Sequence, residues 1–181
     1  MRTTTKTPLL LSLLLVAGSV ACARVEADVP DMAVTHHAVS FQGIPGSHQA
    51  GEVSVTESFT LDSSDLSWAK NLNSDVYAYE VEVKGVGDTQ DLSFIHYAHI
   101  SMSNGAKDST TPPVEIVDYE RPADYVASPV ITAPTLTPVN VSSVWESDQV
   151  VITLVLAGIF PEQGWQADVT IHMSGKVSYK F

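Results

Sequence analysis

The sequence has little cysteine and few basic residues. Cys22 is its only cysteine, so an intramolecular disulfide is impossible and the fold must be stabilised by apolar burial. The chain has 9 lysine and arginine residues against 21 acids and a formal net charge of −12. Nucleic acids and anionic lipid surfaces are bound through clustered cations, so this composition argues against both as partners.

An apolar run long enough to span a membrane is also missing. The apolar run near the start of the chain has the form of a secretory signal. Arg2 and Lys6 precede the apolar stretch Leu9 to Ala21, which is too short to span a bilayer as a helix. We therefore expect residues 1–21 to be a signal peptide that is removed on export. Its removal takes away two cations and no acid, so the net charge changes from −12 to −14.

The position of the single cysteine indicates a lipid anchor. The stretch Leu15-Val-Ala-Gly-Ser-Val-Ala-Cys22 resembles the processing site of bacterial lipoproteins. In that class the cysteine becomes the lipidated first residue of the mature protein, and the resemblance implies this role for Cys22. Ala23 follows, where Asp commonly retains a lipoprotein at the inner membrane, so the outer membrane is favoured.

Two features leave alternatives open. Ser19 stands where lipoproteins prefer Leu, and Ser19 with Ala21 also satisfies the small-x-small rule for ordinary signal cleavage. Cleavage after Ala23 is a third option. In either case the protein would be periplasmic or secreted rather than held at the membrane.

Behind the signal, we expect two regions. Residues 22–50 predict an N-terminal tether with an edge strand over Ala33 to Phe41, closed by a Gly-Ile-Pro-Gly turn at residues 43–46. Residues 51–181 predict one domain, because apolar and polar residues alternate along most of it.

The alternation predicts an antiparallel β-sandwich of seven or eight strands, with a closed β-barrel as the alternative. Along Trp165 to Met173 every second residue is apolar, and Tyr77, Tyr79, Val81 and Val83 are expected to share a core face in the same way. Gln149 to Phe160 is apolar on both faces and predicts a central strand. Six of the ten prolines lie between Pro112 and Pro138, which predicts a crossing between sheets or a path along an edge.

One short motif carries a second resemblance. Asp91-Leu92-Ser93-Phe94-Ile95, after a glycine-rich turn and before a long strand, is similar to short β-sandwich lipoproteins of unknown role in Gram-negative bacteria. This likeness implies a fold and a location in the cell envelope, and it brings no catalytic motif.

Catalytic and metal-binding motifs are not found. There is no Gly-x-Ser-x-Gly elbow, phosphate loop or dinucleotide fingerprint, so we predict no enzyme, catalytic residue or cofactor. Neighbouring residues of a strand face opposite sides, so His36 and His37 cannot chelate one ion together, and His96 is expected to be a hydrogen-bonded core residue. We predict no metal site. The alternative is a secreted metal-binding protein or hydrolase that uses His96 or His172 with loop acids.

Aromatic residues near loops are the remaining candidates for a ligand surface; they are Trp68, Trp145, Tyr119 and Tyr125. The sequence therefore predicts an exported, lipid-anchored β-sandwich of the cell envelope with a non-enzymatic binding or structural role. Its partners would be the membrane, through Cys22, and a protein or glycan. A further hypothesis is an assembly subunit that lends or receives an edge strand.

Overall fold

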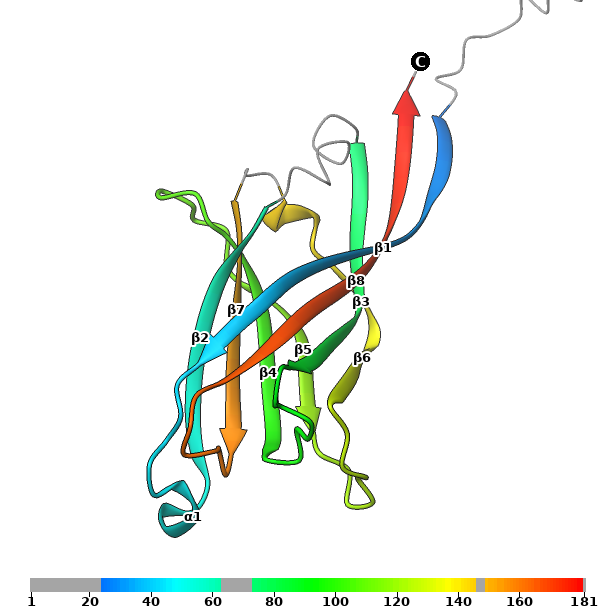
Figure 1. The fold of residues 1–181 in the computed structure, drawn as a ribbon. Helices are drawn as coiled ribbons and strands as arrows, with labels where there is room; N and C mark the ends of the chain where they lie inside the picture. Colours follow the sequence, from blue (N-terminus) through cyan, green and yellow to red (C-terminus); the bar gives the residue numbers. More distant parts are fainter. Residues whose placement is uncertain (1–23, 63–72, 146–148, 181) are drawn as a thin grey trace, which may run out of the picture.

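Nearly all of the regular secondary structure in the described part of the chain is β-strand (Figure 1). The computed structural model describes residues 24–62, 73–145 and 149–180. The strands are β1 (Arg24–Phe41), β2 (Val53–Asp62), β3 (Asn73–Val86), β4 (Ile95–Asn104), β5 (Val114–Glu120), β6 (Val130–Asn140), β7 (Gln149–Gly158) and β8 (Trp165–Lys180). A short helix, α1 (Ser47–Ala50), and a 3-10 turn, Ser142–Val144, complete the described elements.

The eight strands form two antiparallel sheets of four, so the predicted β-sandwich is confirmed and the closed barrel is not observed. The orders are β1-β8-β3-β6 and β2-β7-β4-β5. The first strand thus pairs with the last, the second with the seventh, the third with the sixth and the fourth with the fifth. This is one long hairpin rolled up so that successive pairs fall in alternate sheets, which is the arrangement of an eight-stranded jelly roll.

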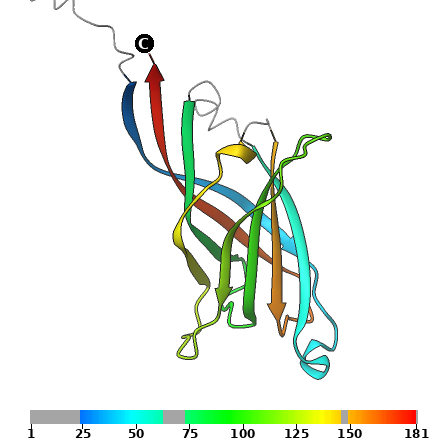
Figure 2. The same cartoon turned by 180° about the vertical axis from the view of Figure 1, so that it is seen from behind.

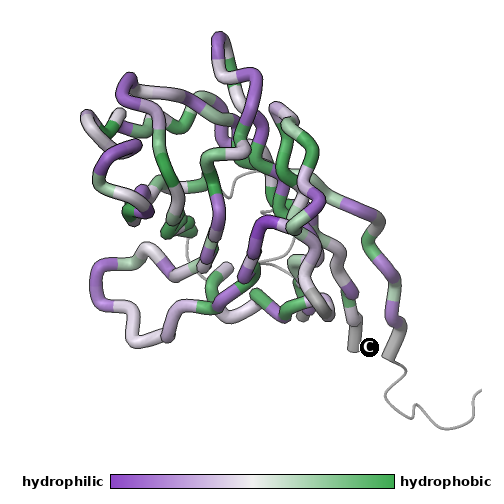
Figure 3. The backbone as a smooth tube through the Cα atoms, turned by 90° about the horizontal axis from the view of Figure 1, so that it is seen from below, coloured by the Kyte–Doolittle hydropathy of each residue, from purple (hydrophilic) through white to green (hydrophobic). Residues whose placement is uncertain are grey.

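The core lies between the two sheets and follows the alternation of the sequence. In β7, Val150, Ile152, Leu154 and Leu156 are fully buried, while the residues between them are half-buried. β7 has β2 on one side and β4 on the other, which confirms the predicted central strand. Viewed from below in Figure 3, apolar and polar positions alternate along the strands around this interior.

The expected faces are reversed in the first half of β3. Val76 and Ala78 are buried there, whereas Tyr77 and Tyr79 are only half-buried. The cause is a β-bulge, because the pairing with β8 slips between Ala78 and Glu80. A single extra residue turns all later side chains to the other face, so the prediction that Tyr77 and Tyr79 face the core with Val81 is wrong.

Both expectations for the proline-rich stretch hold. β5 is an edge strand of one sheet, β6 is an edge strand of the other, and the chain between them crosses from sheet to sheet. Figure 2 shows this side of the sandwich.

β1 lies within the segment predicted to hold a tether and an edge strand. It is an edge strand, as expected, but it begins at Arg24 rather than near Ala33 and pairs with β8 over most of its length. The two strands leave the body of the sandwich together, with the start of β1 beside the end of β8 (Figure 1).

The sandwich therefore has two distinct ends. β1 starts at one, which we call the N-terminal end. The loops at residues 42–52, 87–94, 121–129 and 159–164 lie at the other, which we call the far end (Figure 1).

Candidate functional site at the far end

The structure separates the four predicted ligand aromatics. Tyr119 and Tyr125 are half-buried and lie close together at the far end. Trp145 is only 3 % exposed, so its ring belongs to the core rather than to a ligand surface. Trp68 and Cys22 lie outside the described residues.

Arg121 lies between the two tyrosines, where β5 ends. Its backbone N–H donates to the carbonyl oxygen of His96 at 2.8 Å, and its Nη1 donates to the carbonyl oxygen of Ser93. Beside it is an open cavity of about 390 Å³, lined by Ser93, Arg121, Pro122, Ala123, Tyr125 and Ala127. We call this the Arg121 pocket.

Ser93, which belongs to the motif Asp91 to Ile95, lines this pocket. Asp91 accepts the Ser93 backbone N–H at 2.8 Å and the Ser93 hydroxyl at 2.7 Å, which makes a tight local turn. Leu92 inside the turn is fully buried. The turn thus positions the Ser93 carbonyl oxygen, which accepts the hydrogen bond from the Arg121 side chain.

The loop at residues 121–129 is fastened to the same turn. The carbonyl oxygen of Ser128 accepts the Leu92 N–H at 2.9 Å and the Tyr125 hydroxyl at 3.2 Å. Two segments about 30 residues apart in the sequence are thereby held as one unit, which preorganises the pocket.

The surroundings of Asp91, Tyr119 and Tyr125 keep these side chains in their usual protonation states at neutral pH. The hydrogen bond from the Ser93 side chain lowers the pKa of Asp91, and nearby Arg121 acts in the same direction. Burial raises the pKa of Tyr119 and of Tyr125, and the charge of Asp91 adds to the shift at Tyr125. Asp91 is therefore an anion and both tyrosines keep their hydroxyl protons.

The pocket combines hydrogen-bond donors with apolar surface, which is suited to binding a ligand. Arg121 brings a fixed planar set of N–H donors, of which Nη1 already serves Ser93, while Pro122, Ala123 and Ala127 give apolar walls. A ligand with an oxygen acceptor and an apolar or ring face fits this combination.

Of the residues predicted from the sequence, Tyr125 lines this pocket, whereas Arg121 was not among them. One signal was present: Arg121 is the only arginine after Arg24. A lone arginine at the end of a strand in an acidic chain indicates a positioned cation, because it is not part of a general basic surface.

A second far-end cavity, of about 470 Å³, lies next to Phe41 and Trp165. These two rings stack on each other with centroids 4.0 Å apart, and both are at least 95 % buried. Their faces are used in packing, so this cavity offers a ligand its accessible lining residues, which include Ser40, Gly87, Asp88, Thr89, Gly164 and Gln166.

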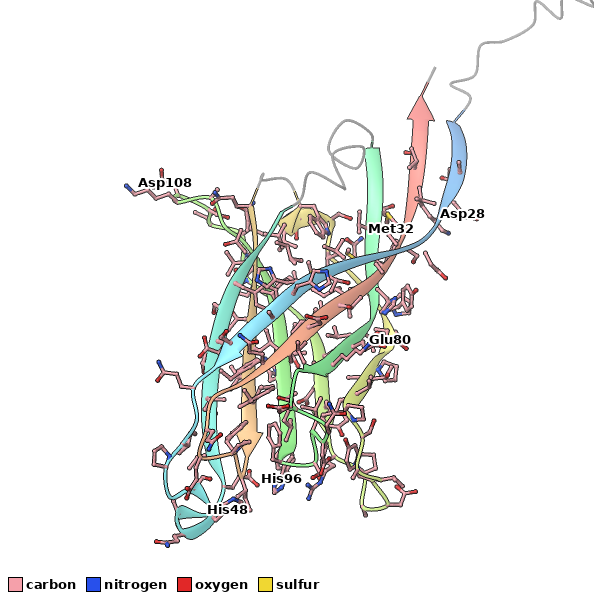
Figure 4. The ribbon with its side chains drawn as sticks, in the orientation of Figure 1. Asp28, Met32, His48, Glu80, His96 and Asp108 are labelled. Carbon is pink, nitrogen blue, oxygen red and sulfur yellow. The ribbon has the colours of Figure 1, made fainter. Side chains whose placement is uncertain are left out.

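Four of the six histidines form separate pairs with carboxylates. The nitrogen-to-oxygen distances are 3.2 Å for His37 and Asp168, 3.0 Å for His96 and Glu52, 3.5 Å for His99 and Glu115, and 3.8 Å for His172 and Glu80. Figure 4 shows His48 and His96 at the far end and Glu80 well away from them. Among the described residues no three His, Cys, Asp or Glu side chains meet as a metal site would require.

His96 differs from its predicted role. It is hydrogen-bonded, as expected, but to the exposed Glu52, and 22 % of its side chain is accessible. The reason is a slip in the pairing of β4 with β7 between Ile95 and Tyr97, which turns His96 away from the core.

Comparisons with known proteins leave the function open. No family model and no curated protein matches the sequence. Among solved structures, the chain is similar to the decameric BFDV capsid protein, with a TM-score of 0.40 and 10 % identity over 86 % of this chain and 99 % of that one. It is also similar to a chain of the semi-empty virus-like particle of the giant freshwater prawn Macrobrachium rosenbergii nodavirus, with a TM-score of 0.33 and 10 % identity over 100 % of this chain and 94 % of that one. At these scores and identities the likeness says nothing about what the chain binds.

Within the described residues, none of the helices has the length and apolar character needed to cross a bilayer.

Proposed function

We propose that this protein is an exported lipoprotein of the cell envelope, anchored through Cys22, that binds a protein or glycan without catalysing a reaction. The observation that supports the proposal is that β1 starts at the end of the sandwich opposite the Arg121 pocket. β1 begins at Arg24, two residues after Cys22, and the Arg121 pocket lies at the far end.

The short distance along the chain between Cys22 and β1 determines which end of the sandwich would face the membrane. Two residues span at most about 7 Å, so acyl chains on Cys22 would hold the N-terminal end against the membrane. β8 has 16 residues and runs back from the far end beside β1. At roughly 3.3 Å per residue, the far end would lie about 50 Å along this strand from the anchor, facing a partner.

The hydrogen bonds of the pocket support binding rather than reaction. The Ser93 hydroxyl donates to Asp91 and the Tyr125 hydroxyl donates to the Ser128 carbonyl, so both are engaged in holding the two loops together. A hydroxyl nucleophile needs a neighbouring base that takes its proton, and Asp91, with its lowered pKa, is a weak one.

The anchor is tested by fractionating cells that express Cys22→Ser. We expect the variant in the soluble fraction and the unaltered protein in the membrane fraction, while Ala23→Asp stays membrane-bound and moves toward the inner membrane. Membrane retention of Cys22→Ser would show that the anchor is wrong.

The pocket is tested by binding to glycan and peptide arrays. We expect ligands of the unaltered protein to be lost by Arg121→Gln and kept by Asp108→Asn, a control at an exposed loop of the other end. Equal binding by both variants would exclude the Arg121 pocket as the binding site.

A further inference from the structure

A second surface lies along the side of the sandwich, where β5 and β6 run next to each other. They are edge strands of different sheets, and each has one hydrogen-bonded neighbour among the described strands. Between them is an open groove of about 310 Å³, lined by residues 115–118 of β5 and by Pro134, Thr135, Thr137 and Val139 of β6. We call it the β5–β6 groove.

The path of β6 creates this groove. Val139 pairs with Ala78 and Pro134 pairs with Glu80, so residues 135–138 of β6 stand opposite the single residue Tyr79 of β3. Pro134 and Pro138 bound this excursion, and proline has no N–H to donate to a ladder. On the opposite side of the sandwich, in contrast, the ring of His36 on β1 stacks on Phe59 of β2 at 4.3 Å and joins the two edges.

The groove combines exposed acids of β5 with accessible apolar side chains of β6, which are Pro134 and Val139. A slip in the pairing of β5 with β4 leaves Ile116 and Val117, two neighbours in sequence, both 3 % exposed. Glu115 and Asp118 on either side of them are exposed. No lysine or arginine lines the groove, and the chain as a whole carries a net charge of −12.

We propose that the β5–β6 groove receives an extended, basic segment of a partner protein as an added strand on β5. An exposed strand edge offers backbone hydrogen bonds to such a segment, and pockets for alternate side chains give specificity. Small apolar side chains of the segment pack against Pro134 and Val139. Its lysines or arginines meet Glu115 and Asp118. This surface is separate from the Arg121 pocket and does not depend on the anchor at Cys22.

The test uses the purified protein and a synthetic peptide with blocked ends, Lys-Val-Lys-Val-Lys-Val-Lys, labelled for fluorescence anisotropy. We expect saturable binding that weakens with salt, since exposed charge pairs are screened. A peptide with Glu in place of each Lys should not bind. Hydrogen exchange should show new protection at residues 114–120 when the Lys peptide is present.

Two variants locate the site. Replacing both groove carboxylates, Glu115→Gln with Asp118→Asn, should raise the Kd about fivefold, as expected for two exposed charge pairs. Asp88→Asn with Asp108→Asn changes the net charge equally at exposed loops elsewhere and should leave the Kd within about twofold. Thr137→Lys, which places a cation in the groove, should abolish binding.

Three results would overturn the proposal. One is no binding of the Lys peptide at millimolar concentration, and another is equal loss in the two double variants, which would indicate unspecific charge attraction. The third is a dimer in sedimentation that Thr137→Lys dissociates, because the occupant would then be a second copy of the chain.

Discussion

At the residue scale, Ala38 adopts a backbone conformation that is unfavourable for alanine. Its φ is 54°, the only positive φ of a non-glycine residue in the described ranges. It lies where the pairing of β1 with β8 slips between His36 and Val39. Asp168 on β8 accepts the Ala38 N–H at 2.9 Å and pairs with His37 at 3.2 Å, so one carboxylate holds the bulge in place.

Ala38→Gly should stabilise the protein, which is unusual for this substitution. The left-handed conformation costs alanine about 1–2 kcal/mol, whereas the added freedom of glycine in the unfolded chain costs about 0.5–1 kcal/mol. We expect the free energy of unfolding in urea to rise by about 0.5 kcal/mol. Ala33→Gly, in the regular part of β1, should lower it. A loss of equal size in both variants would show that Ala38 is not strained.

Asp91 should make stability depend on pH. Its folded pKa lies below the ordinary value, so its contribution is present above the ordinary carboxyl pKa and is lost as the pH falls through the folded pKa. Asp91→Asn should therefore lower the free energy of unfolding at pH 7, by about 0.5 kcal/mol for an exposed carboxylate, and the difference should disappear in strong acid.

The partner of Asp91 supplies the check. Ser93→Ala removes the donor of the 2.7 Å hydrogen bond and should reduce the same pH dependence. If urea melts of the double variant show the full sum of the two single losses at pH 7, the groups act independently and the pKa shift has another cause.

At the element scale, the regular strands were predictable and their bulges were not. The alternation from Trp165 to Met173 places the buried residues of β8 correctly, because this stretch pairs with β3 in register up to the slip opposite Tyr79. In β3 the same pattern fails for Tyr77 and Tyr79. A bulge is decided by how neighbouring strands fit together, and nothing in the residues around Tyr79 marks it in advance.

The residues of the candidate site were likewise predictable only in part. Tyr119 and Tyr125 were predicted because they lie near loops, a property of local sequence. The contacts of Arg121 with Ser93 and His96 join residues 25–28 positions apart and exist only once β4 and β5 pair. Trp145 resembled the tyrosines in sequence, and only packing of the folded chain shows that it is buried.

Gly158, at the end of β7, lies against the backbone of the turn that precedes β4. A Cβ atom at this position would lie 1.8 Å from the carbonyl oxygen of Phe94, which also accepts the Ile159 N–H at 3.0 Å. Gly158→Ala should therefore lower the free energy of unfolding by about 1–3 kcal/mol, the usual cost of overpacking. Gly164→Ala, whose nearest contact would be 3.2 Å, should cost far less. The measurement is urea unfolding of both variants. Equal losses of unfolding free energy would mean that the turn before β4 can shift to make room for the added methyl group.

At the scale of the whole molecule, the pairing of first strand with last determines what an anchored protein can present. Since β1 and β8 pair, the start of β1 and the end of β8 share the N-terminal end, and the far end carries α1 and connecting loops. The proposed anchor at Cys22 would leave the Arg121 pocket facing outward, and the β5–β6 groove along the side would stay open to a partner strand.

This orientation can be measured on the lipidated protein in vesicles whose headgroups carry an energy-transfer acceptor. A donor attached at Asp108→Cys lies at the N-terminal end and one at His48→Cys lies at the far end (Figure 4). Because Arg24 is within about 7 Å of the anchor, we expect clearly stronger transfer from position 108 than from position 48. Adding Cys22→Ser should abolish transfer from both positions. Equal transfer, or stronger transfer from position 48, would mean that the sandwich lies flat or inverted on the membrane, and the far end would then not be the surface offered to a partner.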